Sequence, residues 1–263
     1  MDLHMLKAKV RGTSHIRKGQ VCQDALKIVE LGDNVLLAVA DGHGSSSCPY
    51  SDTGSQIAVE VFTDLMGDYL RQVEYSNLKQ FLNREGSLKI ARDIDRKWKS
   101  RVKEHYHRDL KEGQTLKDEE LWKLYGTTLL GMVLTPDFYF AFQIGDGDII
   151  HLSEVGVREV IAGDALLGTE THSLSHANAW QKAHATVGGI SRESCPQAFM
   201  LTTDGFSNSY SSKSEFTQTS RSYFEAVRCH GVQSVDAHLV EWLTETSRDG
   251  SGDDITLVMG IFL

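Results

Sequence analysis

Residues 35–44 read V-L-L-A-V-A-D-G-H-G, in which six apolar residues lead directly into an aspartate, a histidine and two glycines. A short, uninterrupted apolar run is typical of a buried strand. Asp41, Gly42 and His43 follow the point where such a strand would end, and a strand end is a rigid support for functional side chains. The stretch therefore predicts a core strand that presents a carboxylate and an imidazole, although D-G pairs are also common in ordinary turns.

The composition indicates one soluble domain. The chain has 263 residues, 40% of them hydrophobic, and no proline- or serine-rich linker, so we expect a single domain over residues 1–263. Its 27 Lys and Arg against 36 Asp and Glu give a net charge of -9, which disfavours nucleic acid and membrane surfaces as partners. The sequence shows no signal-like start and no membrane-length apolar run. Its four cysteines are far apart, so we expect reduced thiols and a cytoplasmic location.

Short β-branched or aromatic runs bounded by Gly, Asp or Asn predict strands. They are residues 26–31, 35–40, 128–135, 138–144, 148–152, 157–161, 199–203 and 256–262. Longer stretches predict helices at 52–73, 87–111, 215–229 and 233–247. In the second helix, apolar residues recur every fourth position from Ile90 to Tyr106 among many charges, which is typical of a helix with a solvated outer face.

The order of these elements indicates an α+β fold. Tight turns (T-P-D, G-D-G and E-V-G) separate the strands between residues 128 and 161, and they predict antiparallel pairing of neighbouring strands. Two central helices precede these strands, and two more precede the last strand. We therefore expect two antiparallel β-sheets packed as a sandwich and flanked by pairs of α-helices.

Aspartates occur at the ends of several predicted strands. They are Asp24, Asp41, Asp146, Asp204, and the pair Asp253 and Asp254. Each one alone is better explained as a turn residue. Together they place carboxylates on five strand ends, where converging side chains would repel one another unless cations or protons neutralised them.

This pattern favours a hard divalent cation. Oxygen donors without nearby cysteines suit Mn²⁺ or Mg²⁺ rather than zinc or copper. Two such ions about 3.5–4 Å apart, sharing a carboxylate and a water, would activate that water and hold a phosphate for in-line attack. His43 follows Asp41 closely enough to protonate a leaving alkoxide as a general acid, although a lone turn histidine is more often a surface residue.

The motifs resemble those of the PPM (type 2C) metal-dependent protein phosphatases. D-G-H-G at 41–44, G-T-T at 126–128, G-D at 145–146, T-T-D-G at 202–205 and G-D-D-I-T at 252–256 occur in the family's order. The opening G-T-S-H and C-Q-D-A segments are similar to the bacterial stand-alone subgroup. The resemblance spans almost the whole chain. It implies a β-sandwich flanked by helix pairs and hydrolysis of phosphoserine or phosphothreonine by a metal-activated water.

The resemblance also implies roles for individual residues. Asp41 matches the carboxylate that bridges both metals, and Gly42 matches the residue whose carbonyl binds one of them. Asp204 and Asp253 match ligands that complete the other metal's shell, while Asp24 would act near the second metal through water.

Two further positions match functional residues of the family. Asp146 occupies the place of an acid associated with an additional metal position, so the expected cofactors are two Mn²⁺ or Mg²⁺ ions, or three if Asp146 also binds one. His43 matches the family's general acid.

Some positions depart from the family pattern. Gln23 replaces an acidic residue and adds no charge. Either Asp253 or Asp254 is a candidate ligand, and alignment on the following Ile-Thr favours Asp253. The family's phosphate-binding arginine has no direct match. Candidates for that role are Arg17, Lys18 and His15, and a hairpin turn explains the first two equally well.

Residues 163–198 contain His172, His176 and His184 without clear periodicity. A variable, mobile flap beside the active site explains this segment better than a histidine metal site. We expect the flap and the insertion at 74–123 to set substrate choice.

Three functions are consistent with the sequence. The first is a protein Ser/Thr phosphatase that acts on the phosphorylated substrate of a cognate Ser/Thr kinase. The second is a catalytically weak phosphoprotein-binding regulatory module on the same fold, suggested by Gln23 and the displaced arginine. The third is a metal-dependent hydrolase of small phosphate esters, which would differ only in the flap.

Overall fold

The computed structural model describes residues 2–109, 116–161 and 172–263. Its named strands form two antiparallel sheets of five strands each, so the predicted α+β sandwich is confirmed. The β1 sheet contains, in spatial order, β1 (Leu3–Val10), β10 (Ile255–Phe262), β9 (Gln197–Thr202), β6 (Asp148–Ser153) and β7 (Gly156–Glu159). The β3 sheet contains β2 (Ala25–Leu31), β3 (Asn34–Ala40), β4 (Leu129–Leu134), β5 (Phe138–Ile144) and β8 (His184–Gly189).

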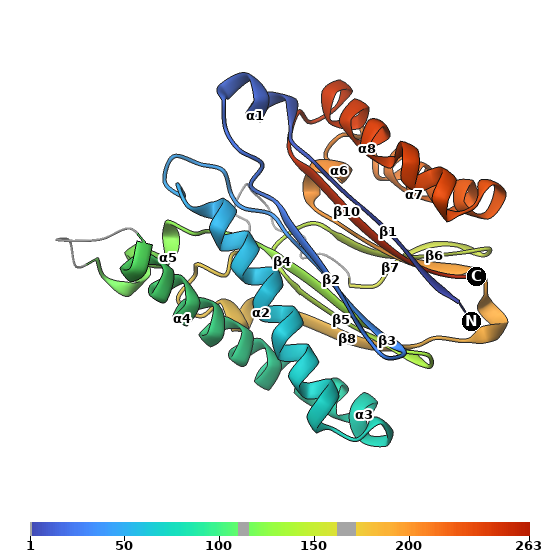
Figure 1. The fold of residues 1–263 in the computed structure, drawn as a ribbon, viewed down its shortest axis with the longest axis horizontal. Helices are drawn as coiled ribbons and strands as arrows, with labels where there is room; N and C mark the ends of the chain where they lie inside the picture. Colours follow the sequence, from blue (N-terminus) through green and yellow to red (C-terminus); the bar gives the residue numbers. More distant parts are fainter. Residues whose placement is uncertain (1, 110–115, 162–171) are drawn as a thin grey trace.

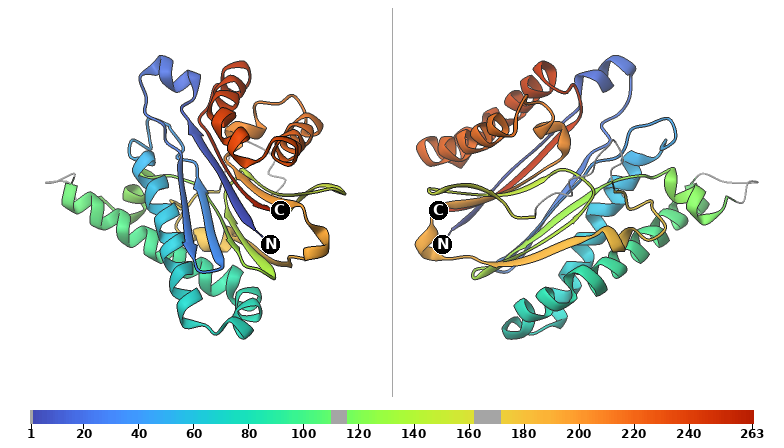
Figure 2. Two further views of the ribbon diagram at one scale, coloured as in Figure 1. Left: turned by 45° about the vertical axis from the view of Figure 1, so that its right-hand side comes forward. Right: turned by 180° about the vertical axis from the view of Figure 1, so that it is seen from behind.

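Helices cover the outer face of each sheet (Figure 1). The β3 sheet is covered by α2 (Ser51–Gln72), α3 (Tyr75–Glu85) and α4 (Ala91–Asp109), with a π-helical turn at Gly86–Ile90 between the last two. The β1 sheet is covered by α7 (Lys213–His230) and α8 (Val232–Asp249). Figure 2 shows the same layers from two further sides. The short helices are α1 (Thr13–Lys18), α5 (Asp118–Lys123) and α6 (Asp204–Ser207), and short 3₁₀ turns occur at Ala179–Lys182 and Arg192–Ser194.

The core strand β3 is buried on both faces. Leu36, Ala38 and Ala40 pack toward the helices, whereas Leu37 and Val39 pack between the two sheets. Side chains alternate between the faces of a strand, so a strand covered on both sides has no polar position. This double burial explains the continuous apolar run that precedes Asp41.

Helix α4 follows the predicted amphipathic pattern. Ile94, Trp98 and Val102 are fully buried under α2, and the indole of Trp98 donates a hydrogen bond to the carbonyl of Gly54 at 3.0 Å. Of the charged residues between them, Arg96 is exposed and Lys97 and Arg101 are half-buried, whereas Asp95 and Lys99 are buried. No helix in the described ranges is long and apolar enough to cross a membrane.

One expectation about strand pairing is wrong. The turns after β4 and β6 join paired antiparallel strands, but G-D-G at 145–147 does not. Here β5 belongs to the β3 sheet and β6 to the β1 sheet, so the chain crosses the sandwich at this turn. Gly145 and Gly147 have φ of 92° and 98°, a backbone conformation that glycine permits and that redirects the chain sharply.

The expected flap is partly regular structure. Residues 184–189 form β8, which pairs with β5 from Phe138↔Gly189 to Gln143↔His184 at the edge of the β3 sheet. Residues 163–171 of this segment lie outside the described residues. The strand β8 lacked a strong apolar run because it is an edge strand, most of whose residues are half-buried.

Candidate metal centre

Asp41 is held by the G-T-T motif. The Thr128 amide and the Thr127 hydroxyl donate hydrogen bonds to the Asp41 carbonyl at 2.9 and 2.8 Å. The Asp41 amide donates to the Thr128 hydroxyl at 3.0 Å. These bonds satisfy the backbone where β3 ends, so the Asp41 side chain is presented from a fixed support.

Gly42 lies where no larger residue fits. A β-carbon at this position would approach the carbonyl oxygens of Ser51 and Gln23 to 2.6 and 2.7 Å. Real β-carbons do not come so close to backbone oxygen, so any other residue would displace the start of α2 or the C-Q-D-A segment.

Asp24 is a buried acid and Asp204 a half-buried one, and each has one buried oxygen without a well-formed hydrogen bond. Asp204 begins α6, directly beyond β9, and its Oδ2 accepts a hydrogen bond from Asn208 Nδ2 at 2.8 Å. Asp24 is 3% exposed, and its Oδ2 accepts a hydrogen bond from the Thr203 hydroxyl at 2.8 Å. The Oδ1 atoms of both acids are buried and accept no hydrogen bond of good geometry among the described residues, although a hydrogen bond from the nearby Thr256 side chain partly offsets the rise in the pKa of Asp24.

Asp253 and Asp254 have different surroundings. Asp254 is 3% exposed, and its carboxylate accepts hydrogen bonds from the amides of Gly12 and Gln23 at 2.6 and 2.7 Å. It therefore ties the start of β10 to the segments around β1 and β2. The side chain of Asp253, in contrast, is half-exposed. His15 lies between them, with Nδ1 3.0 Å from Asp254 Oδ1 and Nε2 3.6 Å from Asp253 Oδ1.

Several of these side chains line one cavity of about 270 Å³ at this end of the sandwich. Its walls contain the predicted residues His15, Lys18, Asp41, Gly42, His43, Asp146, Asp204 and Asp253, together with Gln20, Gly44 and Ser45. Neither Asp24 nor Arg17 is among its lining residues, although the Asp24 carboxylate is close enough to raise the pKa of Asp41. Arg17 Nε instead donates to the carbonyl of Thr13 within α1, at 3.2 Å.

The acids perturb one another electrostatically. Burial raises the pKa of Asp41, and the carboxylates of Asp24 and Asp204 raise it further. Burial and the Asp254 carboxylate raise the pKa of Asp24 to about 7. Burial also raises the pKa of Asp204. A cluster of this kind binds either protons or cations at neutral pH.

His43 packs tightly beside the acids. A β-carbon on Gly126 would lie 2.6 Å from His43 Cδ2, so the absence of a side chain at this position provides the space for the imidazole. Burial lowers the pKa of His43, nearby Asp146 opposes that shift, and His176 adds to it. The ring is therefore held beside the acids by packing against the G-T-T turn.

The donor set fits a well-hydrated divalent ion. Within the described ranges, no three or more His, Cys, Asp or Glu side chains are arranged to hold a metal ion by themselves. Mg²⁺ commonly keeps several waters and uses only one or two protein carboxylates. The orphaned oxygens of Asp24 and Asp204, together with the raised acid pKa values, fit such an ion.

Comparison with known proteins identifies the family. The family model described as protein phosphatase 2C matches residues 11–244. The chain belongs to this family. No curated protein sequence matches it.

Solved structures show the same fold. Serine/threonine phosphatase Stp1 from Staphylococcus aureus aligns with a TM-score of 0.65 at 11% identity, covering 100% of this chain and 96% of that chain. The Mycobacterium tuberculosis serine/threonine phosphatase PstP/Ppp aligns with a TM-score of 0.62 at 15% identity, covering 100% and 99%. The catalytic domain of PstP in complex with two manganese ions gives 0.61 at 16% identity, covering 98% and 97%.

In this member of the protein phosphatase 2C family, two supporting roles were missed from the sequence. Thr203 binds Asp24 through its hydroxyl and receives a hydrogen bond from the Thr256 amide at 3.0 Å. Asp254 accepts hydrogen bonds from the amides of Gly12 and Gln23 and so joins the segments around these two residues to its own. The T-T-D-G and G-D-D-I-T motifs contained both residues, but only the folded chain shows which acid faces inward.

Proposed function

We propose that this protein hydrolyses phosphoserine or phosphothreonine in proteins, using a water activated between two Mn²⁺ or Mg²⁺ ions. The observation that carries this proposal is the cavity in which Asp41, Asp204 and Asp253 converge from both sheets beside His43. Membership of the protein phosphatase 2C family supports a phosphatase. The substrate would be a phosphoprotein, which a Ser/Thr kinase must supply.

The acidic residues would bind the ions. Asp41 and the Gly42 carbonyl would hold the shared position, and Asp204 and Asp253 would complete one shell. Asp24 is buried and does not line the cavity, so it would act through water. Asp146 lies at the cavity wall and would hold an additional ion. When bound, the ions supply a hydroxide-like nucleophile at neutral pH and neutralise charge on the phosphate.

Basic residues at the rim would orient the phosphate. His15 and Lys18 line the cavity and are better placed than Arg17, whose guanidinium bonds within α1. His43 would give a proton to the leaving alkoxide oxygen of serine or threonine. Burial lowers the pKa of His43, which makes the imidazolium a stronger acid, while Asp146 keeps part of its proton affinity.

The test is hydrolysis of a phosphothreonine peptide and of p-nitrophenyl phosphate with Mn²⁺, with Mg²⁺ and with EDTA. We expect turnover of both substrates that depends on the metal. The matched variants are Asp41→Asn and Asp204→Asn, which keep side-chain size and remove charge. If the wild type shows no metal-stimulated turnover, the enzyme proposal is wrong. If either variant retains full activity, the ligand assignment is wrong.

A second candidate is a phosphoprotein-binding module of low activity. It is favoured by the neutral Gln23 at an acidic position and by the absence of arginine from the described walls of the cavity. Tight binding of the phosphothreonine peptide with no turnover in any metal would support this candidate over the enzyme.

A further inference from the structure

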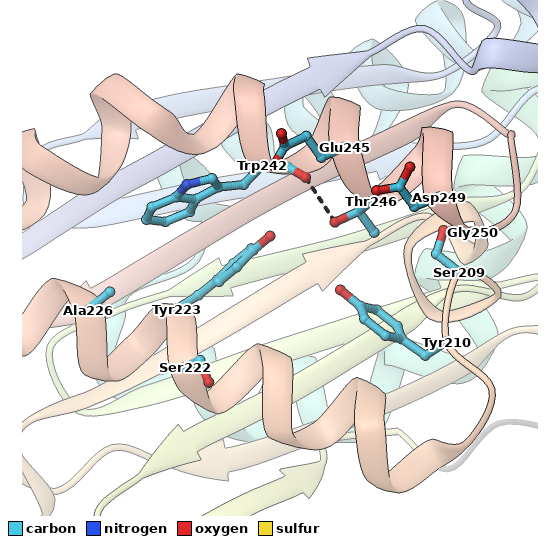
Figure 3. Close-up of a pocket in the computed structure, with 10 residues that line it drawn as sticks. All are labelled: Ser209, Tyr210, Ser222, Tyr223, Ala226, Trp242, Glu245, Thr246, Asp249 and Gly250. Atoms are coloured by element: carbon cyan, nitrogen blue, oxygen red, sulfur yellow. Dashed lines mark hydrogen bonds between the residues drawn. The ribbon is translucent and has the colours of Figure 1, made fainter.

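A second cavity lies between α7 and α8, on the outer face of the β1 sheet (Figure 3). Its volume is about 560 Å³, within the range of pockets that bind small organic molecules. It shares no lining residue with the cavity that contains Asp41. The sequence motifs described above do not include its walls.

Three aromatic rings form much of this cavity. The rings of Tyr223 and Trp242 lie 5.5 Å apart between centroids, and Tyr210 lines the cavity from the loop before α7. Figure 3 shows the Tyr210 and Tyr223 hydroxyls on the side of the cavity that faces Thr246. The Tyr210 hydroxyl is buried near the hydroxyls of Thr219 and Thr246, but it forms no hydrogen bond of good geometry among the described residues. The cavity therefore offers aromatic faces and an unsatisfied polar atom.

The charges at the rim are acidic. Glu245 and Asp249 line the cavity, and none of its described lining residues is Lys, Arg or His. Arg248 approaches from outside, with Nε 2.8 Å from Asp249 Oδ1 and Nη2 3.9 Å from Glu245 Oε1. These groups are more than half exposed, and exposed ion pairs contribute little free energy. A cation in the cavity can therefore compete with Arg248 for the two carboxylates.

We propose that this cavity binds a small organic cation that carries an aromatic or branched apolar body. Aromatic faces attract cations, and the apolar body replaces water against Tyr223 and Trp242. A hydrogen-bond donor on the cation would give the Tyr210 hydroxyl oxygen the well-aligned hydrogen bond that it lacks among the described residues.

The cavity is built from the segments that carry two proposed metal ligands. Both Tyr210 and Tyr223 pack against Phe206, at centroid distances of 5.3 and 5.9 Å, and Phe206 is two residues beyond Asp204. Through this packing, a bound cation can shift the helix that presents Asp204. A role of the bound cation as an effector of the metal centre rests on the proposed function, whereas binding of the cation itself does not.

Hydrogen bonds connect the same two segments. The hydroxyls of Ser209 and Ser251 both donate to the Gly205 carbonyl, at 2.7 and 2.9 Å. The Asp253 amide donates to the Ser251 hydroxyl at 3.2 Å. Occupation of the cavity would thus bias the positions of Asp204 and Asp253 together.

The binding test uses three probes of similar size with different charge: phenethylamine, phenethyl alcohol and 3-phenylpropionate. Each is titrated into the metal-free wild-type protein in EDTA and followed by ¹H–¹⁵N NMR. The indole signal of Trp242 is assigned with Trp242→Phe. We expect phenethylamine to bind about fivefold more tightly than the alcohol, the scale of one exposed cation–π contact, and the anion to bind most weakly.

Rim variants sharpen this test. Glu245→Gln with Asp249→Asn should abolish the preference for the cation, and Arg248→Gln should strengthen cation binding because it removes the competing guanidinium. Glu241→Gln, on the same helix but outside the cavity, is the control and should change nothing. Equal binding of the cation and the alcohol overturns the proposed ligand class. No shift of the Trp242 signal with any probe overturns the site.

The effector role is tested by repeating the phenethylamine titration at saturating Mg²⁺. Because coupling is reciprocal, metal that orders the Asp204 and Asp253 segments should tighten probe binding, by about threefold. An unchanged Kd overturns the coupling. Failure of the metal centre is seen separately, as an absence of Mg²⁺ binding by calorimetry, and it leaves the metal-free titrations interpretable.

Discussion

Lys99 and Asp95 form an almost fully buried ion pair on α4, with Lys99 Nζ 2.7 Å from Asp95 Oδ1. The same ammonium donates hydrogen bonds to the carbonyls of His176 and Ala177 at 2.8 and 2.7 Å and lies 4.4 Å from the centre of the Trp122 ring. One side chain therefore fixes the loop before β8 against the helical layer. The adjoining part of that loop bonds to the G-T-T turn beneath Asp41, through Ser173 and Leu174.

Lys99→Met should destabilise the protein and release this loop. The substitution leaves the Asp95 carboxylate buried without its partner, which costs about 3 kcal/mol in free energy of unfolding. Urea unfolding measures that loss, and limited proteolysis should show new cleavage near residues 176–182. Lys97→Met is the control, because the Lys97 side chain is 40% exposed and lies 3.8 Å from Asp68 in a weak surface pair. Equal destabilisation by both variants would contradict the anchoring role.

Asp253→Asn and Asp254→Asn should separate metal binding from folding. In Asp254→Asn, an amide NH₂ would face the Gly12 or Gln23 N–H, leaving a buried donor unsatisfied at a cost of about 2 kcal/mol. Asp253→Asn should leave unfolding unchanged and weaken Mg²⁺ binding by at least tenfold. Chemical denaturation and calorimetry of both variants check this. The reverse pattern would make Asp254 the ligand.

The metal-free protein should be less stable at pH 8 than at pH 5.5. The folded state raises the pKa of Asp24 to about 7, and it also raises those of Asp41 and Asp204. The folded state then binds more protons than the unfolded chain. The stabilisation that these protons contribute is complete below about pH 4 and is lost as the pH rises toward 7. Thermal unfolding in EDTA should show the decrease, about 5 °C in Tm. At pH 8, Mg²⁺ should restore the lost thermal stability. The Asp24→Asn variant should show a smaller change of Tm with pH.

His43→Ala should slow hydrolysis of the phosphothreonine peptide about 100-fold, the usual contribution of general acid catalysis. Hydrolysis of p-nitrophenyl phosphate should fall much less, because nitrophenolate needs little protonation as it leaves. Steady-state kinetics with both substrates at fixed metal concentration checks the difference. Equal losses with the two substrates would argue against proton donation by His43.

Gly126→Ala tests the position of the same ring without removing it. The added methyl would lie 2.6 Å from His43 Cδ2 and 3.1 Å from Cys48 Sγ, so the imidazole must move. We expect the same substrate dependence as His43→Ala with a smaller loss, and unchanged Mg²⁺ affinity. Gly189→Ala is a control, because a β-carbon there meets no atom within 4 Å. Unaltered peptide turnover in Gly126→Ala would show that the ring position is not critical.

Most of the fold was predictable because its strands carry strong local signals. The run before Asp41 is apolar throughout since β3 is covered on both faces. Strand β1 was missed, although Leu6, Ala8 and Val10 alternate inward, because lysines occupy the exposed positions between them. The crossing between β5 and β6 was also missed, because a G-D-G turn has the same local chemistry whether the next strand pairs or changes sheets.

The candidate site was predictable as a set of acids but not as a geometry. The sequence places Asp41, Asp204 and Asp253 at strand ends, and the folded chain brings them to one cavity. It could not show that Asp254 turns inward to backbone amides, since that choice depends on a contact 242 residues away in the chain. No sequence motif indicates the cavity between α7 and α8, because its aromatic residues have the spacing of ordinary core residues of amphipathic helices.

The acids come from both sheets, which has a mechanical consequence. Asp41 extends from the β3 sheet and Asp204 from the β1 sheet, while the chain termini lie together at another part of the sandwich (Figure 1). Ions shared by these acids would clamp the two layers at a single edge. Under a pulling force, the layers would then separate first where only apolar contacts join them, and the clamped edge would be the last to part.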